Sequence, residues 1–157
     1  AETCHLVLST IHAPSTYQAL ERIIDLFPPH ERHMVQTRLA SLMVRVLCQS
    51  LVPRAIGTGR IAAVEVLLAN SAVKNLIREG KIYQLPNVIR TSRDEGMLTL
   101  DESLVDLYRR EKIDRDTVFD YCNEPEEVAR ILGGRVRSSH SRRKSKIVGS
   151  TTLSMLM

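Results

Sequence analysis

The chain has 157 residues, of which 43% are hydrophobic, 25% charged and only 4% aromatic, a composition that indicates a globular protein with an aliphatic core. The net charge is +4, but residues 135–157 hold six of the 22 basic residues and no acid, so the remaining 16 basic and 18 acidic residues leave the rest mildly acidic. No apolar run approaches the roughly 18 residues of a membrane-spanning helix, and we expect no secretory signal. Three widely spaced cysteines, Cys4, Cys48 and Cys122, predict buried thiols in a reducing compartment.

The segment HLVLSTIHAP, residues 5–14, predicts the first strand. Its apolar residues are consecutive rather than alternating, and Pro14 ends it. A short run of this kind is typical of a central strand in a parallel sheet, buried on both faces. Ser15 or Thr16 then provides a cap for a following helix.

Two helices and a hairpin follow in the sequence. Apolar residues at helical spacing predict one helix that ends at Phe27 and a second from Glu31 to about Leu42. Between residues 44 and 69 the pattern changes to alternation with a period of two, interrupted by AIGTG. This change predicts two antiparallel strands joined as a β-hairpin.

The rest of the chain is predicted to be helical as far as residue 134. SAVKNLIREG, residues 71–80, has Ser71 as a possible cap and Gly80 as its end. A capping box, Thr99–Glu102, starts another helix, and Pro125 starts the last one. Residues 135–157 are rich in Ser, Arg and Lys, which predicts a disordered tail.

The histidines of the first strand are candidate functional residues. His5 and His12 are seven positions apart, so a regular strand would direct them to opposite faces and they would not share one metal ion. His12 falls at the carboxyl end of the strand, where open α/β sheets bind ligands. An isolated histidine is more often structural than functional, so only this position makes His12 a candidate.

Other patterns fail as metal or phosphate sites. His30 and His33 lack a third zinc ligand nearby, and DRDTVFDYCNEPE has Val118 and Phe119 where a calcium loop needs an oxygen ligand and glycine. The Gly-Lys pair at 80–81 lacks the rest of the phosphate-binding pattern Gly-x-x-x-x-Gly-Lys-Ser/Thr. We therefore predict no metal site and no self-contained nucleotide site.

Three stretches together resemble one family. AETCHLVLSTIH is similar to the His box of the type II/IV secretion ATPases, usually Ala-Glu-Thr-Gly-His-Leu-Val followed by Thr-Leu-His. AVKNLIREGK resembles the Ala-Ile-Arg-Asn-Leu-Ile-Arg-Glu signature of the pilus-retraction, or twitching-motility, branch. RIIDLFPP, LVPR and GRIAAVEVLL lie between them in the expected order, so the resemblance covers about residues 1–132.

The resemblance implies an α/β fold, namely the C-terminal half of a RecA-like P-loop ATPase domain. Residues 1–70 would form the second half of the ATPase core, residues 71–134 a helical C-terminal subdomain and residues 135–157 a basic tail. In the family, the phosphate loop (Walker A) and Walker B precede the His box. The chain would therefore lack both and be inactive alone, and whether it is itself an enzyme stays open.

The resemblance also implies function and site residues. The family is a cytoplasmic hexamer, peripheral at the inner membrane, that uses ATP and Mg in the full-length protein to retract type IV pili. Its partners would be inner-membrane platform proteins, with no specific nucleic acid. His12 matches the second His-box histidine, as a phosphate sensor, and His5 the first, with a structural role. Asn75, Arg78 and Glu79 fall within the retraction signature.

Some positions depart from the family pattern and leave other functions open. Cys4 replaces the usual glycine, the pair at 13–14 is less polar than usual, and Lys74 replaces arginine. One alternative is a non-catalytic module, or degenerate paralogue, that docks on the pilus or secretion machinery. Another is a related pilus-assembly or type II secretion ATPase, and a third is nucleic-acid binding through the basic residues between 135 and 146.

Overall fold

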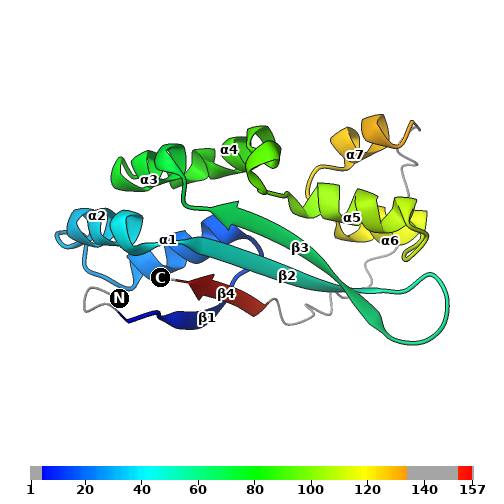
Figure 1. Ribbon diagram of the computed structural model, residues 1–157, viewed down its shortest axis with the longest axis horizontal. Helices are drawn as coiled ribbons and strands as arrows, with labels where there is room; N and C mark the ends of the chain where they lie inside the picture. Colours follow the sequence, from blue (N-terminus) through cyan, green and yellow to red (C-terminus); the bar gives the residue numbers. More distant parts are fainter. Residues whose placement is uncertain (1–4, 134–151, 157) are drawn as a thin grey trace. The chain divides into compact units, whose positions relative to one another are not determined.

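The computed structural model describes residues 5–133 and 152–156, and Figure 1 shows the path of the chain. The elements are β1 (Leu8–His12), α1 (Thr16–Asp25), α2 (Arg32–Leu42), β2 (Arg45–Pro53), β3 (Arg60–Leu68), α3 (Ser71–Arg78), η1 (Ile82–Gln84), α4 (Leu85–Thr91), η2 (Arg93–Glu95), α5 (Leu100–Arg109), α6 (Arg115–Tyr121), α7 (Pro125–Ile131) and β4 (Thr152–Leu156). Both η elements are single 3-10 turns. The two predicted N-terminal helices and the predicted hairpin are confirmed.

The four strands form one sheet in the order β1-β4-β2-β3, with β4 between β1 and β2 (Figure 1). β4 is antiparallel to both neighbours and pairs Ser154 with Thr10 of β1 and with Leu47 of β2. The prediction of a buried, central and parallel first strand is wrong, because β1 lies at the sheet edge and four of its five residues are exposed. A run of apolar residues indicates that a strand can be buried on both faces. Its position in the sheet depends on the strands with which it pairs.

β4 also falls inside the predicted tail. Five residues of that segment pair with two other strands, so disorder is a wrong prediction for Thr152–Leu156. All six basic residues of the tail lie between 135 and 146, outside the described residues. The expectation of disorder there stays a prediction.

The described chain forms two compact units. The first consists of residues 5–49, 64–99 and 152–156, and the second of residues 50–63 and 100–133. The hairpin therefore contributes its base to the first unit and its tip to the second. This division differs from the expected boundary at residue 70, because two-residue alternation does not show which helices a hairpin tip packs against.

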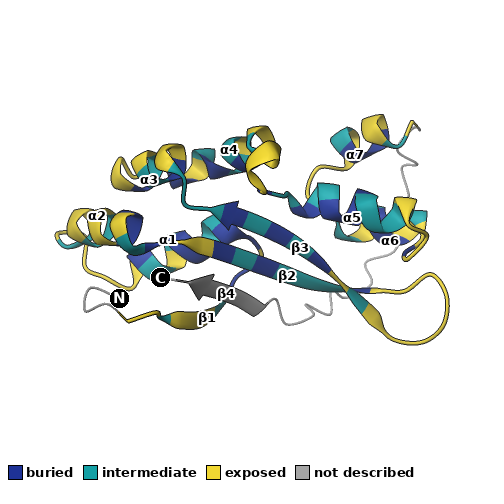
Figure 2. Cartoon of the chain, in the orientation of Figure 1, coloured by how far each residue is buried: buried dark blue, intermediate teal, exposed yellow. Residues whose placement is uncertain are grey.

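The first unit has one aliphatic core, to which its helices and the base of the hairpin contribute. Leu20 of α1, Leu39 of α2, Val46 of β2, Leu67 of β3 and Ile77 of α3 are all buried in it. Figure 2 shows the alternation of buried and half-buried positions along β2 and β3 that the sequence predicts. Each such side chain contributes about 1.5–3 kcal/mol through its removal from water.

Two helices of the first unit, α1 and α3, begin at polar side-chain caps. The Ser15 hydroxyl accepts a hydrogen bond from the Gln18 N–H at 3.4 Å and starts α1, as expected. The cap of α3 is Asn70, whose Oδ1 accepts from the Val73 N–H at 3.0 Å. The prediction of Ser71 as this cap is wrong by one residue, because an amide oxygen reaches the free N–H groups of the first turn as well as a hydroxyl does.

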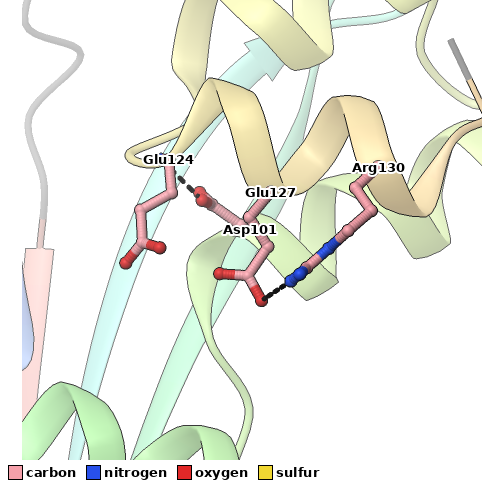
Figure 3. A network of polar contacts seen from close by, with 4 residues as sticks. All are labelled: Asp101, Glu124, Glu127 and Arg130. Atoms are coloured by element: carbon pink, nitrogen blue, oxygen red, sulfur yellow. Dashed lines mark hydrogen bonds and ion pairs between the residues drawn. The ribbon is translucent and has the colours of Figure 1, made fainter.

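The second unit has a separate core and polar connections of its own. Its buried residues include Val52 and Ala63 of the hairpin tip, Leu104 of α5, Val118 of α6 and Val128 of α7. Asp101 joins α5 to the segment before α7, because its carboxylate accepts from the N–H groups of Asn123 at 2.7 Å and Glu124 at 2.8 Å. Figure 3 shows the bond between Asp101 and Glu124, together with the pair of Glu127 and Arg130 on α7, which are 3.4 Å apart.

Candidate functional site

His12 is the last residue of β1, at the carboxyl end that the sequence predicts. His12 is exposed, and its Cα lies opposite that of Thr152 in β4. Its backbone carbonyl accepts a hydrogen bond from the guanidinium of Arg22, in the last turn of α1. The main chain of His12 is therefore held by α1 and by β4, while the residue stays exposed.

The turn that follows His12 is held by the hairpin. The Sγ of Cys48 on β2 donates to the carbonyl oxygens of Ala13, at 3.7 Å, and Pro14, at 3.4 Å. Burial raises the pKa of the Cys48 thiol from 9.0 to about 12, with a smaller contribution from the negative charge of Glu65. Cys48 therefore keeps its proton at neutral pH and acts as a hydrogen-bond donor.

The first residue of α1 is held by β3. Glu65 is 8% exposed and Thr16 is fully buried. Oε1 of Glu65 accepts from the backbone N–H of Thr16 at 2.8 Å and from its hydroxyl at 2.5 Å. This carboxyl accepts from an N–H group that has no partner within the helix. The positive end of the helix dipole stabilises its negative charge.

His5 lies apart from this arrangement in the secondary structure. It precedes Leu8, where β1 begins, so the alternation of a regular strand does not relate it to His12. It is exposed. Its expected structural role stays a prediction. Cys4, which replaces the family glycine, lies outside the described residues.

No cluster of three or more His, Cys, Asp or Glu side chains that could hold a metal ion is present in residues 5–133 and 152–156. In the same part of the chain, no helix is both long and apolar enough to cross a bilayer.

Comparison with known proteins identifies the family. The chain is 44% identical over 110 residues to the twitching motility protein of Neisseria gonorrhoeae, a match that covers 70% of this chain and 29% of that protein. It is 38% identical over 126 residues to the type IV pilus retraction ATPase PilT of Pseudomonas aeruginosa, with coverages of 80% and 36%. The chain belongs to the type IV pilus retraction ATPase family. It spans about a third of the length of these relatives, which fits the expected C-terminal part.

Solved structures of a pilus retraction motor and of another ATPase share the fold. The crystal structure of the pilus retraction motor PilT with bound ADP matches with a TM-score of 0.66 at 29% identity, over 76% of this chain and 33% of that chain. The ATPase DotB of Legionella pneumophila matches with a TM-score of 0.56 at 17% identity, over 68% and 29%. The RecA-like α/β fold class is thereby confirmed. No family model matches the chain.

The retraction signature forms an exposed polar face on α3. Arg78 donates from Nη1 to Oδ1 of Asn75 at 2.9 Å, and Glu79 pairs with Lys81 at 2.8 Å. The hydrogen bond and charge of Lys81 lower the pKa of Glu79. The apolar side of α3 is buried in the core through Ile77. The three signature residues are thus available on the surface, and their functional role stays a prediction.

Sequence reasoning gave no role to the residues that hold the His12 segment. Arg22 and Glu65 lie in stretches that match the retraction ATPase family, and Cys48 was expected only to be buried. Glu65 carried a usable signal, because it occupies an inward-facing position of a predicted strand, and charged residues are rarely buried without partners. The identity of its partner, Thr16, is visible only in the folded chain.

Proposed function

We propose that this chain is the C-terminal part of a hexameric ATPase that powers type IV pilus retraction. The observation that carries the proposal is the similarity, over 80% of the chain, to the Pseudomonas aeruginosa retraction ATPase. The similarity to a second relative, the twitching motility protein of Neisseria gonorrhoeae, agrees with it. The alternatives expected from the sequence are not favoured by these relatives.

We further propose that His12 senses the terminal phosphate of ATP. An imidazole N–H at a strand end is suited to donate a hydrogen bond to a phosphate oxygen, and such charge-assisted bonds are among the strong ones. The support is the fixed main chain of His12, bonded by Arg22, next to its exposed side chain. A signal from the phosphate would pass into α1, which carries Arg22.

The residues present do not fit a complete site for ATP and Mg²⁺. The sequence contains no Gly-x-x-x-x-Gly-Lys-Ser/Thr loop, and the described residues hold no cluster of metal ligands. We therefore derive no chemical step through the metal from this chain. What its residues supply is a contact to phosphate from His12 and a path from that contact into the fold.

The oligomer, partners and location are proposals of the same kind. The retraction motor was solved with ADP, which supports nucleotide binding by the complete protein. A homo-hexameric, cytoplasmic ring that acts at the inner membrane beside pilus platform proteins is consistent with the family. Asn75, Arg78 and Glu79 offer an exposed polar face for contacts in such an assembly.

A chimera tests the proposal. Residues 1–132 replace the matching segment of the Pseudomonas aeruginosa retraction ATPase, and ATP hydrolysis and twitching motility are measured. We expect both activities, and a loss of about 100-fold or more in kcat for His12→Ala, the size expected when one donor to developing charge is removed. His30→Ala is the matched control, because His30 is an exposed histidine, with its side chain 3.6 Å from Glu31.

Two outcomes would contradict the proposal. A chimera that assembles but neither hydrolyses ATP nor supports motility would remove the proposed function. A His12→Ala chimera with an unchanged kcat would remove the sensor role alone.

A further inference from the structure

Glu65 is the one buried charged residue of the first unit among those described, and it bonds Thr16, four positions after His12 in the chain. We propose that Glu65 is a positioning residue for His12. By holding Thr16 it sets the start of α1, and through α1 and the preceding turn it sets the place of the His12 backbone. This inference rests on the proposed sensor role of His12 and goes beyond it, because it connects that sensor to the β-hairpin.

Burying the carboxyl of Glu65 costs free energy, so this position must provide hydrogen bonds to it. A buried carboxylate loses its hydration, and it is stable only where hydrogen bonds replace the lost water. Thr16 provides two donors to this carboxyl, its N–H and its hydroxyl. The two bonds therefore restrain the direction as well as the position of the first turn of α1.

The path from Thr16 to His12 is short and held at each end. Ala13 and Ser15 are buried, Pro14 has a fixed φ, and Cys48 bonds the carbonyls of residues 13 and 14. Arg22 returns from the far end of α1 to the carbonyl of His12. A displacement of α1 would therefore move His12 by two routes, the turn and the Arg22 bond.

The same residue lies on the strand that leads to the retraction signature. β3 carries Glu65 and ends at Leu68, and α3 begins at Ser71. A movement of His12 on loss of the terminal phosphate would displace Thr16 and, through their hydrogen bonds, Glu65 on β3. The described contacts thus provide a continuous route from the proposed sensor to the start of α3.

Nuclear magnetic resonance of the whole 157-residue chain tests the positioning. We expect Glu65→Ala to shift the Thr16 amide and both the amide and ring signals of His12. Glu65→Gln keeps an oxygen acceptor, so it should restore most of the wild-type His12 positions. Ile89→Ala is the control, because Ile89 of α4 lies in the same core but outside the turn and the retraction signature, and this variant should leave the His12 signals in place.

A milder variant covers the case in which Glu65→Ala unfolds the chain. Thr16→Val deletes the hydroxyl donor and keeps the N–H, and it should still shift the His12 signals. Folded Glu65→Ala or Thr16→Val chains with unchanged His12 signals would overturn the inference.

Hydrolysis in the chimera gives a second readout. We expect Glu65→Ala to lower kcat by about 10- to 100-fold, with little change in KM. A displacement of the His12 side chain by about 1 Å lowers the rate of the chemical step more than it weakens substrate binding. Glu65→Gln should recover most of that loss, and Ile89→Ala should lower neither value. An equal loss in Ile89→Ala and Glu65→Ala would overturn the positioning role. An inactive wild-type chimera would instead contradict the proposed function. The resonance shifts would still test whether Glu65 positions His12.

Discussion

The carboxyl of Glu65 on β3 accepts two hydrogen bonds from Thr16, one from the backbone N–H at 2.8 Å and one from the hydroxyl at 2.5 Å. The two residues are 49 positions apart in the chain. Their contact joins the first turn of α1 to the hairpin, next to the histidine that the family resemblance identifies as a site residue.

This contact predicts a stability effect of its own. Glu65→Ala leaves the buried Thr16 donors without their acceptor, so the free energy of unfolding should fall by about 1–3 kcal/mol. Glu79→Ala is the matched control, because its pair with Lys81 is exposed to water and such surface pairs contribute little to stability. Urea denaturation at pH 7 measures both. Equal, small losses would show that the Thr16 donors are satisfied by water instead.

Cys48 predicts a decline in stability at alkaline pH. Its pKa is raised from 9.0 to about 12 by burial, so the folded chain keeps a proton that the unfolded chain loses. The resulting stabilisation is fully present below pH 9 and is lost as pH rises towards 12. Urea denaturation between pH 8 and 10.5 should show a steeper decline for the wild type than for Cys48→Ala.

The same burial predicts slow chemical modification. Only the thiolate reacts with alkylating reagents, and burial raises the pKa of Cys122 to about 11 as well. At pH 8, mass spectrometry of peptides from iodoacetamide-treated protein should find Cys48 unmodified in the native chain and modified in urea. Rapid native labelling of Cys48 would contradict its burial.

Asp114 predicts a loss of stability in acid. Its carboxylate caps α6 by accepting from the Thr117 N–H at 2.6 Å, and bonds from Thr117 lower its pKa below 3.8. The stabilisation is present above pH 3.8 and is lost as pH falls through the lowered folded pKa. Asp114→Ala should cost about 1 kcal/mol at pH 7 and less at pH 3, as measured by urea denaturation. Asp120→Ala, at the other end of α6, should cost less at pH 7.

Two helix ends predict opposite responses to glycine and alanine. After α5, the N–H groups of Glu111 and Lys112 bond the carbonyls of Tyr108 and Leu107, and Glu111 has a φ of 57°. Because a left-handed backbone strains a side chain, Glu111→Gly should raise the free energy of unfolding by about 0.5–1 kcal/mol.

The corresponding position after α3 is Gly80, with a φ of 71°. Gly80→Ala should lower stability by about 1–2 kcal/mol, and its Cβ would approach Nε2 of Gln36 to 3.3 Å. Thermal unfolding of Glu111→Gly and Gly80→Ala measures both changes in stability. A stabilised Gly80→Ala would show that the helix end relaxes out of this conformation.

ATP hydrolysis by the isolated chain is predicted to be absent. The chain has no phosphate loop to hold the β- and γ-phosphates, so a phosphate-release assay should give the same rate for the wild type and His12→Ala. Turnover that His12→Ala abolishes would show that the chain completes a nucleotide site by itself.

Local elements of this protein follow from local sequence. The period of two between residues 44 and 69 and the helical spacing of 71–80 predict β2, β3 and α3 because side-chain direction depends only on neighbouring backbone angles. The end of β1 at His12 is predicted for the same reason, since Pro14 follows it closely. Asn70 rather than Ser71 as the cap of α3 shows the limit, because both residues offer an oxygen and the register of the first turn chooses between them.

By itself, the sequence determined the hairpin, five of the helices (α1, α2, α3, α5 and α7), the retraction ATPase resemblance and the place of His12 at a strand end. Tertiary structure alone decided the antiparallel pairing of β4 with β1, the edge position of β1, the bonds of Cys48 to the turn after His12 and those of Glu65 to the first residue of α1. Each of these joins residues far apart in the chain. The periodicity of a segment records which of its side chains need burial, but the partner that buries or bonds them depends on the packing of the whole unit.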